Sequence, residues 1–401
     1  MSESAGLSAS EIASGVTSGE LDPVDVVREH LAAMEECSEL NAVITSCADA
    51  ALRRAQAGVS GPLAGVPLLV KDLFDTAGVR TTYGSAIYRE HVPQRTATAV
   101  TLLEAAGAIT IAKTNLHEFA WGVTSQNPHF GSVQNPVRPG LVAGGSSGGN
   151  SAALAAGFGA LALGTDTGGS VRIPAACCDN VGFKPTLGKV AIEGCFALSP
   201  SFDTVGPMGR SVGDCALAHQ VLTGEPVPEP RLEGVVVGVL APTPGAERLE
   251  ALGARLVEAS LPEPAADLIA IFMVECAISH RHTYPSRRSE YGRDLQLKFD
   301  MARLVPGIDV FEAREELPRW RARLEREPAV DLLISPTLGI EVPALDCFEP
   351  DVRAGLTALT RPFNYTGWPA IAIGDLQIAG RDDATVLAAA LAYEQATAST
   401  T

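Results

Sequence analysis

The chain has 401 residues, of which 46% are hydrophobic and 19% are charged, and its formal net charge is −17 at pH 7. This composition is typical of a globular protein and excludes a largely disordered one. The acidic excess argues against nucleic acid or an anionic membrane as a partner, because both are bound by basic patches.

The cysteines and the N-terminus indicate the compartment. The eight cysteines form no CxxC pair and have no histidine at zinc-ligand spacing, so we expect reduced thiols and no metal site. The first residues, MSESAGLSASEIASG, lack the basic and apolar regions of a signal peptide. The most apolar run, SAALAAGFGALALG, is too short to span a bilayer. We therefore expect a cytoplasmic protein with no membrane partner.

The first third of the chain alternates between helix and strand signals. Asp22 and Pro23 are a helix start, which predicts a helix over LDPVDVVREHLAAMEE. The apolar run Val66 to Val70 predicts a buried strand that leads into Lys71. AVTLLEAAGAITIAKTN then predicts a helix, a stop at Gly107 and a second strand. This alternation is typical of an α/β fold with a covered sheet.

The remaining sequence continues the same domain. We expect a helix over 151–156 and a strand at ALALGTD. The proline-rich segments 224–230 and 241–246 are interpreted as loops at the edge of one domain, because apolar strands continue along the chain as VVVGVL, DLLISPT and PAIAI. Gly374-Asp375 is a two-residue hairpin signal, and DDATVLAAALAYEQA predicts a last helix. We therefore expect one domain over residues 1–401.

Two glycine-flanked serine sites, Ser146-Ser147 and Ser170, lie within LVAGGSSGGNSAALAAGFGALALGTDTGGSVR, with no histidine between them. A serine nucleophile needs a base, and a lysine can serve if burial lowers its pKa. Lys71, at the end of a predicted buried strand, is the candidate. Taken singly, each feature has an ordinary interpretation: a solvated lysine, a helix-capping loop and a turn. Their combination favours catalysis.

These segments together resemble a known family. GVPLLVKD, GGSSGGNSAALAAG, LALGTDTGGSVRIPA and GFKPT look like the amidase signature family, and AKTNLHEFAWG, SFDTVGPMGRSVGD and FNYTGWPA extend the likeness over nearly the whole chain. The resemblance implies a single α/β domain with a mixed central β-sheet covered by α-helices. It implies a catalytic core at about residues 62–215 and a shortened C-terminal half at about residues 231–397.

The resemblance also assigns roles. It implies that Ser170 is the nucleophile, that Ser146 is a bridging serine held by an unusual cis peptide, and that Lys71 is the base. Asp166 and Arg172 would brace the loop. The oxyanion hole would be formed by main-chain N–H groups of Thr167, Gly168, Gly169 and Ser170. The implied reaction is hydrolysis of a carboxylic amide to carboxylate and ammonia or amine through an acyl-enzyme, without metal or cofactor.

The substrate is less well defined by the sequence. Family segments that can line the acyl pocket contain Phe119, Trp121, Ser147, Phe363 and Trp368, although core packing explains the aromatic residues equally well. If these face the pocket, an aryl or aliphatic primary amide fits better than a charged one. The expected partner is a small-molecule amide, with esters, carbamates and a homodimer left open. An arginine that malonamate-specific relatives carry is replaced by Ile173, which argues against that substrate.

Asp179 departs from the family pattern, because many relatives have a glycine there. Gly144 to Gly148 also matches G-x-S-x-G, which would make Ser146 the nucleophile of an α/β-hydrolase elbow. The other alternative is the glutamine-amidase subunit of a tRNA-dependent amidotransferase. Such chains tend to be longer and to carry C-terminal docking segments, so we favour a stand-alone amidohydrolase.

Overall fold

In the computed structural model, which describes residues 4–398, eleven strands form one mixed sheet. The strand order is β1-β3-β2-β4-β6-β5-β10-β11-β9-β7-β8. The strands are β1 (Val43–Ser46), β2 (Pro67–Lys71), β3 (Ile109–Thr114), β4 (Leu161–Asp166), β5 (Val181–Lys184), β6 (Thr204–Gly209), β7 (Val236–Val239), β8 (Arg255–Glu258), β9 (Leu332–Pro336), β10 (Ala370–Ile373) and β11 (Leu376–Gly380).

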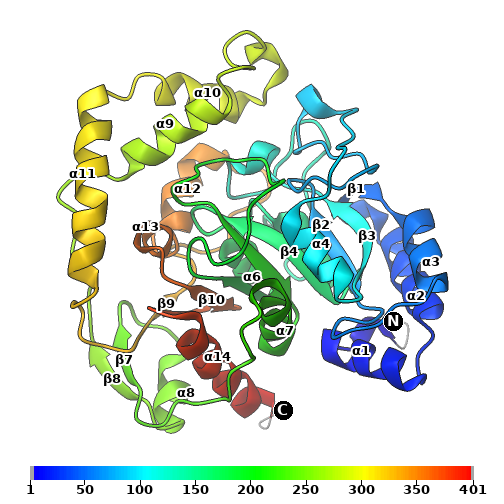
Figure 1. The fold of residues 1–401 in the computed structure, drawn as a ribbon. Coiled ribbons are helices and arrows are strands. Elements are labelled where there is room, and N and C mark those ends of the chain that lie inside the picture. Colours follow the sequence, from blue (N-terminus) through cyan, green and yellow to red (C-terminus); the bar gives the residue numbers. More distant parts are fainter. Residues whose placement is uncertain (1–3, 399–401) are drawn as a thin grey trace.

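Helices cover both faces of this sheet (Figure 1). The α-helices are α1 (Ala9–Ser18), α2 (Pro23–Glu36), α3 (Ala48–Gln56), α4 (Thr98–Ala105), α5 (Gly148–Ala155), α6 (Arg172–Cys177), α7 (Val212–Thr223), α8 (Ala246–Ala251), α9 (Ile269–Ser279), α10 (Arg293–Ala302), α11 (Gly307–Leu324), α12 (Glu349–Thr357), α13 (Pro362–Thr366) and α14 (Asp383–Ala398). Short 3-10 helices lie at η1 (Ser4–Gly6), η2 (Ser38–Leu40), η3 (Ala86–Tyr88), η4 (Glu118–Ala120) and η5 (Arg288–Glu290). The α/β fold expected from the sequence is confirmed.

The local signals in the sequence act as expected. The Asp22 side chain accepts a hydrogen bond from the main-chain N–H of Val24 and caps α2. Gly374 and Asp375 join β10 to β11 as a two-residue hairpin, with Gly374 at a φ of 54°. The helix expected over 151–156 is α5, which begins earlier, directly after Ser147. The serine loop therefore leads straight into this helix.

The three parallel strands β3, β2 and β4 determine where the polar residues meet. Because parallel strands share a direction, the residues at their carboxyl ends lie at one edge of the sheet. Along β2, Leu68 and Val70 pack in one hydrophobic cluster and Leu69 in another, as alternation requires. By the same alternation, Lys71 lies on the face of the sheet that carries Leu69. Helices α5 and α6 cover this face.

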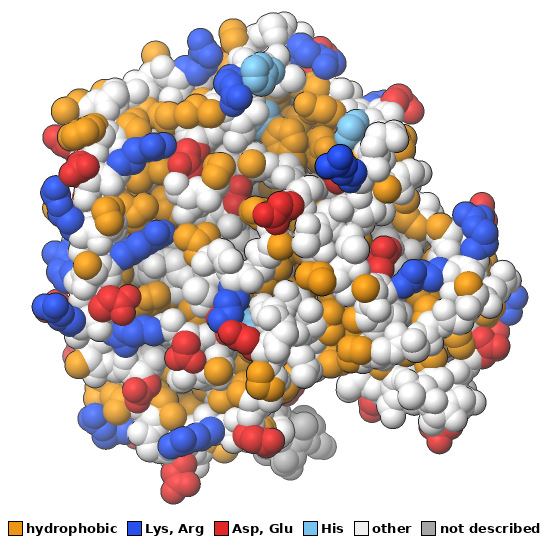
Figure 2. Space-filling view, viewed as in Figure 1, with side chains coloured by type: hydrophobic (Ala, Val, Ile, Leu, Met, Phe, Trp, Pro, Cys, Tyr) orange, Lys and Arg blue, Asp and Glu red, His pale blue; other side chains and the backbone are white. Residues whose placement is uncertain are grey.

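A separate group of helices stands beyond this edge. Helices α9, α10 and α11, drawn in yellow-green to yellow, form a wall at the upper left of Figure 1, with α12 and α13 between them and the sheet. Basic and acidic side chains are interspersed over the face shown in Figure 2. Within residues 4–398, no helix is both long and apolar enough to cross a membrane.

Candidate active site

Lys71 ends β2 with a fully buried side chain. Its Nζ donates to Ser146 Oγ and to Thr165 Oγ1, both at 2.7 Å. Burial lowers the pKa of this amine to about 7, against a smaller opposing effect of nearby groups such as Asp166. A substantial fraction of the amine is therefore neutral near pH 7 and can accept a proton.

Ser146 lies in the loop before α5, and the peptide bond between Gly145 and Ser146 is cis. The Ser146 carbonyl accepts hydrogen bonds from the main-chain N–H of His117 (3.2 Å) and from Ser125 Oγ (3.3 Å). A Cβ on Gly145 would lie 2.9 Å from main-chain atoms of residues 123–125, so only glycine fits this close approach. The loop is thus held on both sides of the serine that contacts Lys71.

Ser170 lies in the turn between β4 and α6 with 5% of its surface exposed. Its carbonyl accepts a hydrogen bond from the main-chain N–H of Ser147 at 3.2 Å, which joins the two serine loops. Its hydroxyl makes no hydrogen bond to any of the residues 4–398. The structure brings Lys71 and Ser146 into direct contact and leaves the Ser170 hydroxyl free at a cavity.

Asp166, the last residue of β4, holds the turn that carries Ser170. Its carboxylate accepts hydrogen bonds from the N–H groups of Gly169 (2.8 Å) and Val171 (3.2 Å). It also pairs with the Arg172 guanidinium at 2.8 Å, and both side chains are fully buried. Burial alone would raise the pKa of this carboxyl, but Arg172 and a hydrogen bond from Asn364 lower it well below its usual range. The pair is therefore charged.

The expected oxyanion hole is only partly available. The N–H of Gly169 already donates to Asp166, so it is not free to bind an oxyanion, in contrast to the expectation from the sequence. Gly168 faces open space, since a Cβ there would meet no atom within 4 Å. Gly169 has a φ of 124°, and a Cβ on it would lie 2.3 Å from Thr360 Oγ1. Glycine is therefore required at 169 by conformation and by space.

The cavity at Ser170 is narrow, with a volume of about 20 Å³. One wall is the turn after β4, with Thr167, Gly168 and Ser170. The rest of the lining combines apolar side chains with two arginines. It consists of Ala120, Gly122, Val123, Leu198, Ile269, Phe272, Arg353, Thr357 and Arg361.

Comparisons with known proteins identify the relatives of this chain. The model of the family described as Amidase matches residues 25–233. The chain is 34% identical to a subunit of the glutamyl-tRNA(Gln) amidotransferase of Thermus thermophilus, with 97% of each chain covered. This chain belongs to the amidase signature family. An amidase crystal structure superposes with a TM-score of 0.89 at 32% identity, covering 98% of this amidase and 100% of the other chain. A 6-aminohexanoate cyclic dimer hydrolase gives 0.89 at 27% identity over 99% and 98% of the two chains.

The amidase is thus an enzyme that acts on amide C–N bonds, as the sequence predicts. Membership also removes the α/β-hydrolase alternative. The residues before Gly144 belong to isolated bridges at Leu141 and Val142 and to no strand of the central sheet, so the strand–turn–helix elbow is missing there.

The aromatic residues expected at the acyl pocket lie elsewhere in this amidase. Phe119, Trp121, Phe363 and Trp368 are buried in the largest hydrophobic cluster, and they are not among the residues that line the cavity. Phe119, for example, packs against Phe196 and His280. Ser147 is also buried, with its Oγ 3.5 Å from the Thr165 carbonyl. The aromatic side chains bury their large apolar areas in the core.

Several residues of the site were not identified from the sequence. Thr165 Oγ1 accepts a hydrogen bond from Lys71 Nζ, which also donates to Ser146 Oγ. Asn364 and Gln377 complete the hydrogen bonds of Arg172 at 2.8 and 2.7 Å. Asn364 lies in the family segment FNYTGWPA, which is a signal that could have indicated it. Arg353 and Arg361 lie in no motif and could not have been found.

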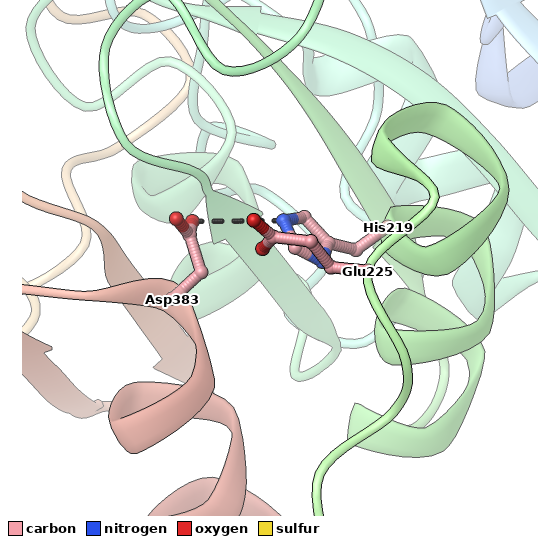
Figure 3. A group of neighbouring side chains, drawn as sticks. All are labelled: His219, Glu225 and Asp383. Atoms are coloured by element: carbon pink, nitrogen blue, oxygen red, sulfur yellow. Dashed lines mark ion pairs between the residues drawn. The ribbon is translucent and has the colours of Figure 1, made fainter.

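Within the described chain, one group could geometrically hold a metal ion. A nitrogen of His219 and carboxylate oxygens of Glu225 and Asp383 lie within 4.8 Å of one another (Figure 3). Lys189 Nζ pairs with Glu225 and lies 4.0 Å from Asp383, so an ammonium already compensates part of the charge of these two carboxylates. None of these residues lines the cavity at Ser170, and we assign no metal to the reaction.

Proposed function

We propose that this amidase hydrolyses small carboxylic amides through an acyl-enzyme on Ser170, with Ser146 and Lys71 as the proton relay. The observation that carries the proposal is the 2.7 Å hydrogen bond between Lys71 Nζ and Ser146 Oγ in a fully buried setting. A lysine with a pKa of about 7 can both accept and return a proton near neutral pH.

In the first step, Ser170 Oγ attacks the amide carbonyl carbon. Its proton passes to Ser146, whose own proton passes to the neutral amine of Lys71. The C–N bond then breaks as the leaving nitrogen takes a proton from Ser146, which Lys71 replenishes. Ammonia or an amine departs, and the acyl group remains as an ester on Ser170. The contact between the two serine hydroxyls would form when substrate orders the site.

The second step reverses the proton path. Water attacks the ester carbonyl and gives a proton through Ser146 to Lys71, and the Ser170 oxygen takes a proton back as the carboxylate leaves. Both steps pass through an oxyanion. We propose that the N–H groups of Thr167, Gly168 and Ser170 bind it, while Gly169 and the Asp166–Arg172 pair hold the turn in place. No metal or organic cofactor enters this scheme.

Ammonia release from a panel of aliphatic, aryl-acetic and dicarboxylic half-amides tests the proposal. We expect turnover by the wild type and a loss of at least about 10³-fold in Ser170→Ala. Ser147→Ala is the matched control, because this neighbouring serine contacts neither Lys71 nor the cavity, and it should retain turnover. Turnover that survives Ser170→Ala would show that another residue is the nucleophile.

Covalent labelling with a fluorophosphonate probe locates the nucleophile independently of the substrate. Peptide mass spectrometry should find the adduct on Ser170. An adduct on Ser146 would contradict the proposal and would return the role of nucleophile to the first serine loop.

A second function is favoured by the 34% identity to the amidotransferase subunit of Thermus thermophilus over 97% of both chains. In that case the protein would release ammonia from glutamine only within a complex. Co-purification with partner proteins, and glutamine hydrolysis only in their presence, would support this function. Turnover of free amides by the isolated chain would support the stand-alone amidase.

A further inference from the structure

The charged residues at the Ser170 cavity are unusual for this protein. The chain as a whole has a net charge of −17, yet the charged side chains that line the cavity are Arg353 and Arg361, with no acidic residue among the described residues of its lining. The nearby carboxylate of Asp203 lies behind Thr167, where it accepts hydrogen bonds from Thr167 Oγ1 and from main-chain N–H groups. The cavity wall is therefore locally cationic.

The two arginines differ in how they are held. Arg353 forms an ion pair with Glu349 at 3.2 Å, and Glu349 in turn pairs with Lys298 at 2.6 Å. Arg353 thus belongs to a network that fixes its position and compensates its charge. Arg361, by contrast, forms no ion pair and no side-chain hydrogen bond within residues 4–398, and its guanidinium only lies over the Tyr365 ring at 6.0 Å.

Arg361 also occupies a particular position. A second cavity of about 540 Å³ adjoins the site, lined by the 261–268 loop, Trp320 and residues around Tyr365. This lining includes two acidic residues, Glu263 and Asp267. Arg361 is the residue that lines both this larger cavity and the narrow one at Ser170. Neither of the two carboxylates forms an ion pair with Arg361, so its partly buried guanidinium, which lines both the outer cavity and the cavity at the nucleophile, has its donors available to bind the carboxylate of a ligand.

We propose that Arg361 binds a carboxylate of the substrate, so that the preferred substrates are amides that carry a second, anionic group, such as the half-amides of dicarboxylic acids. This inference rests on the proposed hydrolysis at Ser170. The guanidinium would bind the carboxylate with two parallel hydrogen bonds, and this contact would direct the amide carbonyl toward Ser170. The charge of Arg353 is already compensated by Glu349, which makes it the weaker candidate for this role.

Binding to the Ser170→Ala variant tests this inference without turnover. Isothermal titration calorimetry would compare succinamate and glutaramate with their neutral isosteres, in which an isopropyl group replaces the carboxylate. The half-amides should bind more tightly than the isosteres. Adding Arg361→Gln should weaken half-amide binding by about 10- to 100-fold and leave the isosteres unchanged. Arg361→Lys keeps the charge and should retain part of the preference.

Arg95→Gln is the control, because Arg95 is exposed and lines neither cavity. It should change neither set of ligands. Equal binding of half-amides and isosteres, or an equal loss of both in Arg361→Gln, would overturn the inference. In the enzyme that retains Ser170, Arg361→Gln should lower kcat/KM for half-amides and not for neutral amides. Turnover that persists in Ser170→Ala would instead refute the proposed nucleophile, and the binding preference would still be measured.

Discussion

The lining of the Ser170 cavity combines the turn that follows β4 with residues of α9, α12 and the segment before α13, and with the loop residues Ala120, Gly122, Val123 and Leu198. The turn and the helical residues differ in how their charges are compensated. In the turn, every charge has a partner: Asp166 and Arg172 are paired at 2.8 Å, and Asn364 bonds to both. On the helical side, apolar side chains surround one compensated arginine and one without an ion pair among the described residues. The charged groups of the turn are used up in holding it, whereas the helical side contains a guanidinium, that of Arg361, with no ion pair among the described residues.

The largest effect should follow from breaking the buried pair on the sheet side. Asp166→Asn leaves the Arg172 guanidinium buried without a counter-charge, so we expect the free energy of unfolding to fall by about 3–5 kcal/mol. Urea denaturation followed by circular dichroism measures this. Asp179→Asn is the matched control, since it removes the carboxylate charge of an Arg–Asp pair whose side chains are 35% and 52% exposed. It should cost no more than about 1 kcal/mol. Equal losses would show that the turn is not held by this pair.

The contrast between the turn after β4 and the helical side of the cavity also explains which residues of the site could be predicted from the sequence. Lys71, Ser146 and Ser170 lie in motifs, and the predicted strand that leads into Lys71 is β2, because a short apolar run bounded by glycines is typical of a buried strand. The helical side depends on tertiary packing between segments far apart in sequence, such as Phe272 and Arg353. Aromatic residues near the motifs were candidates for the pocket, but large apolar side chains serve equally well in a core, where Phe119 and Trp121 lie.

A smaller and graded effect is expected with pH. The proposed mechanism uses the neutral form of Lys71 as the base, and the pKa of this amine is about 7, so kcat/KM should rise about tenfold per pH unit below pH 7 and level off above it. Lys184 provides a control inside the same sheet. Burial lowers its pKa to about 7 as well, but its Nζ donates to the Pro185 carbonyl and not to a serine. Lys184→Met should therefore keep the inflection near pH 7.

The rate of fluorophosphonate labelling, measured as a function of pH, reports the same pH dependence for the attack of the serine nucleophile alone. Loss of the inflection in Lys184→Met, with its retention in Lys71→Met, would show that Lys184 and not Lys71 is the base.

The smallest effect is expected at Asp179, where the family commonly has glycine. Asp179 has a φ of 51°, a conformation that costs a non-glycine residue about 1–2 kcal/mol. Its carboxylate pairs with Arg138 at 2.6 Å, but the pair is largely exposed and contributes about 0–1 kcal/mol. Asp179→Gly removes both terms, which oppose each other, so the free energy of unfolding should change by less than about 1 kcal/mol. Because the residue lies beyond α6 and lines no part of the Ser170 cavity, kcat should be unchanged. Thermal denaturation and the ammonia assay measure the two quantities, and a large loss of activity would show that the turn after α6 transmits its geometry to the catalytic side.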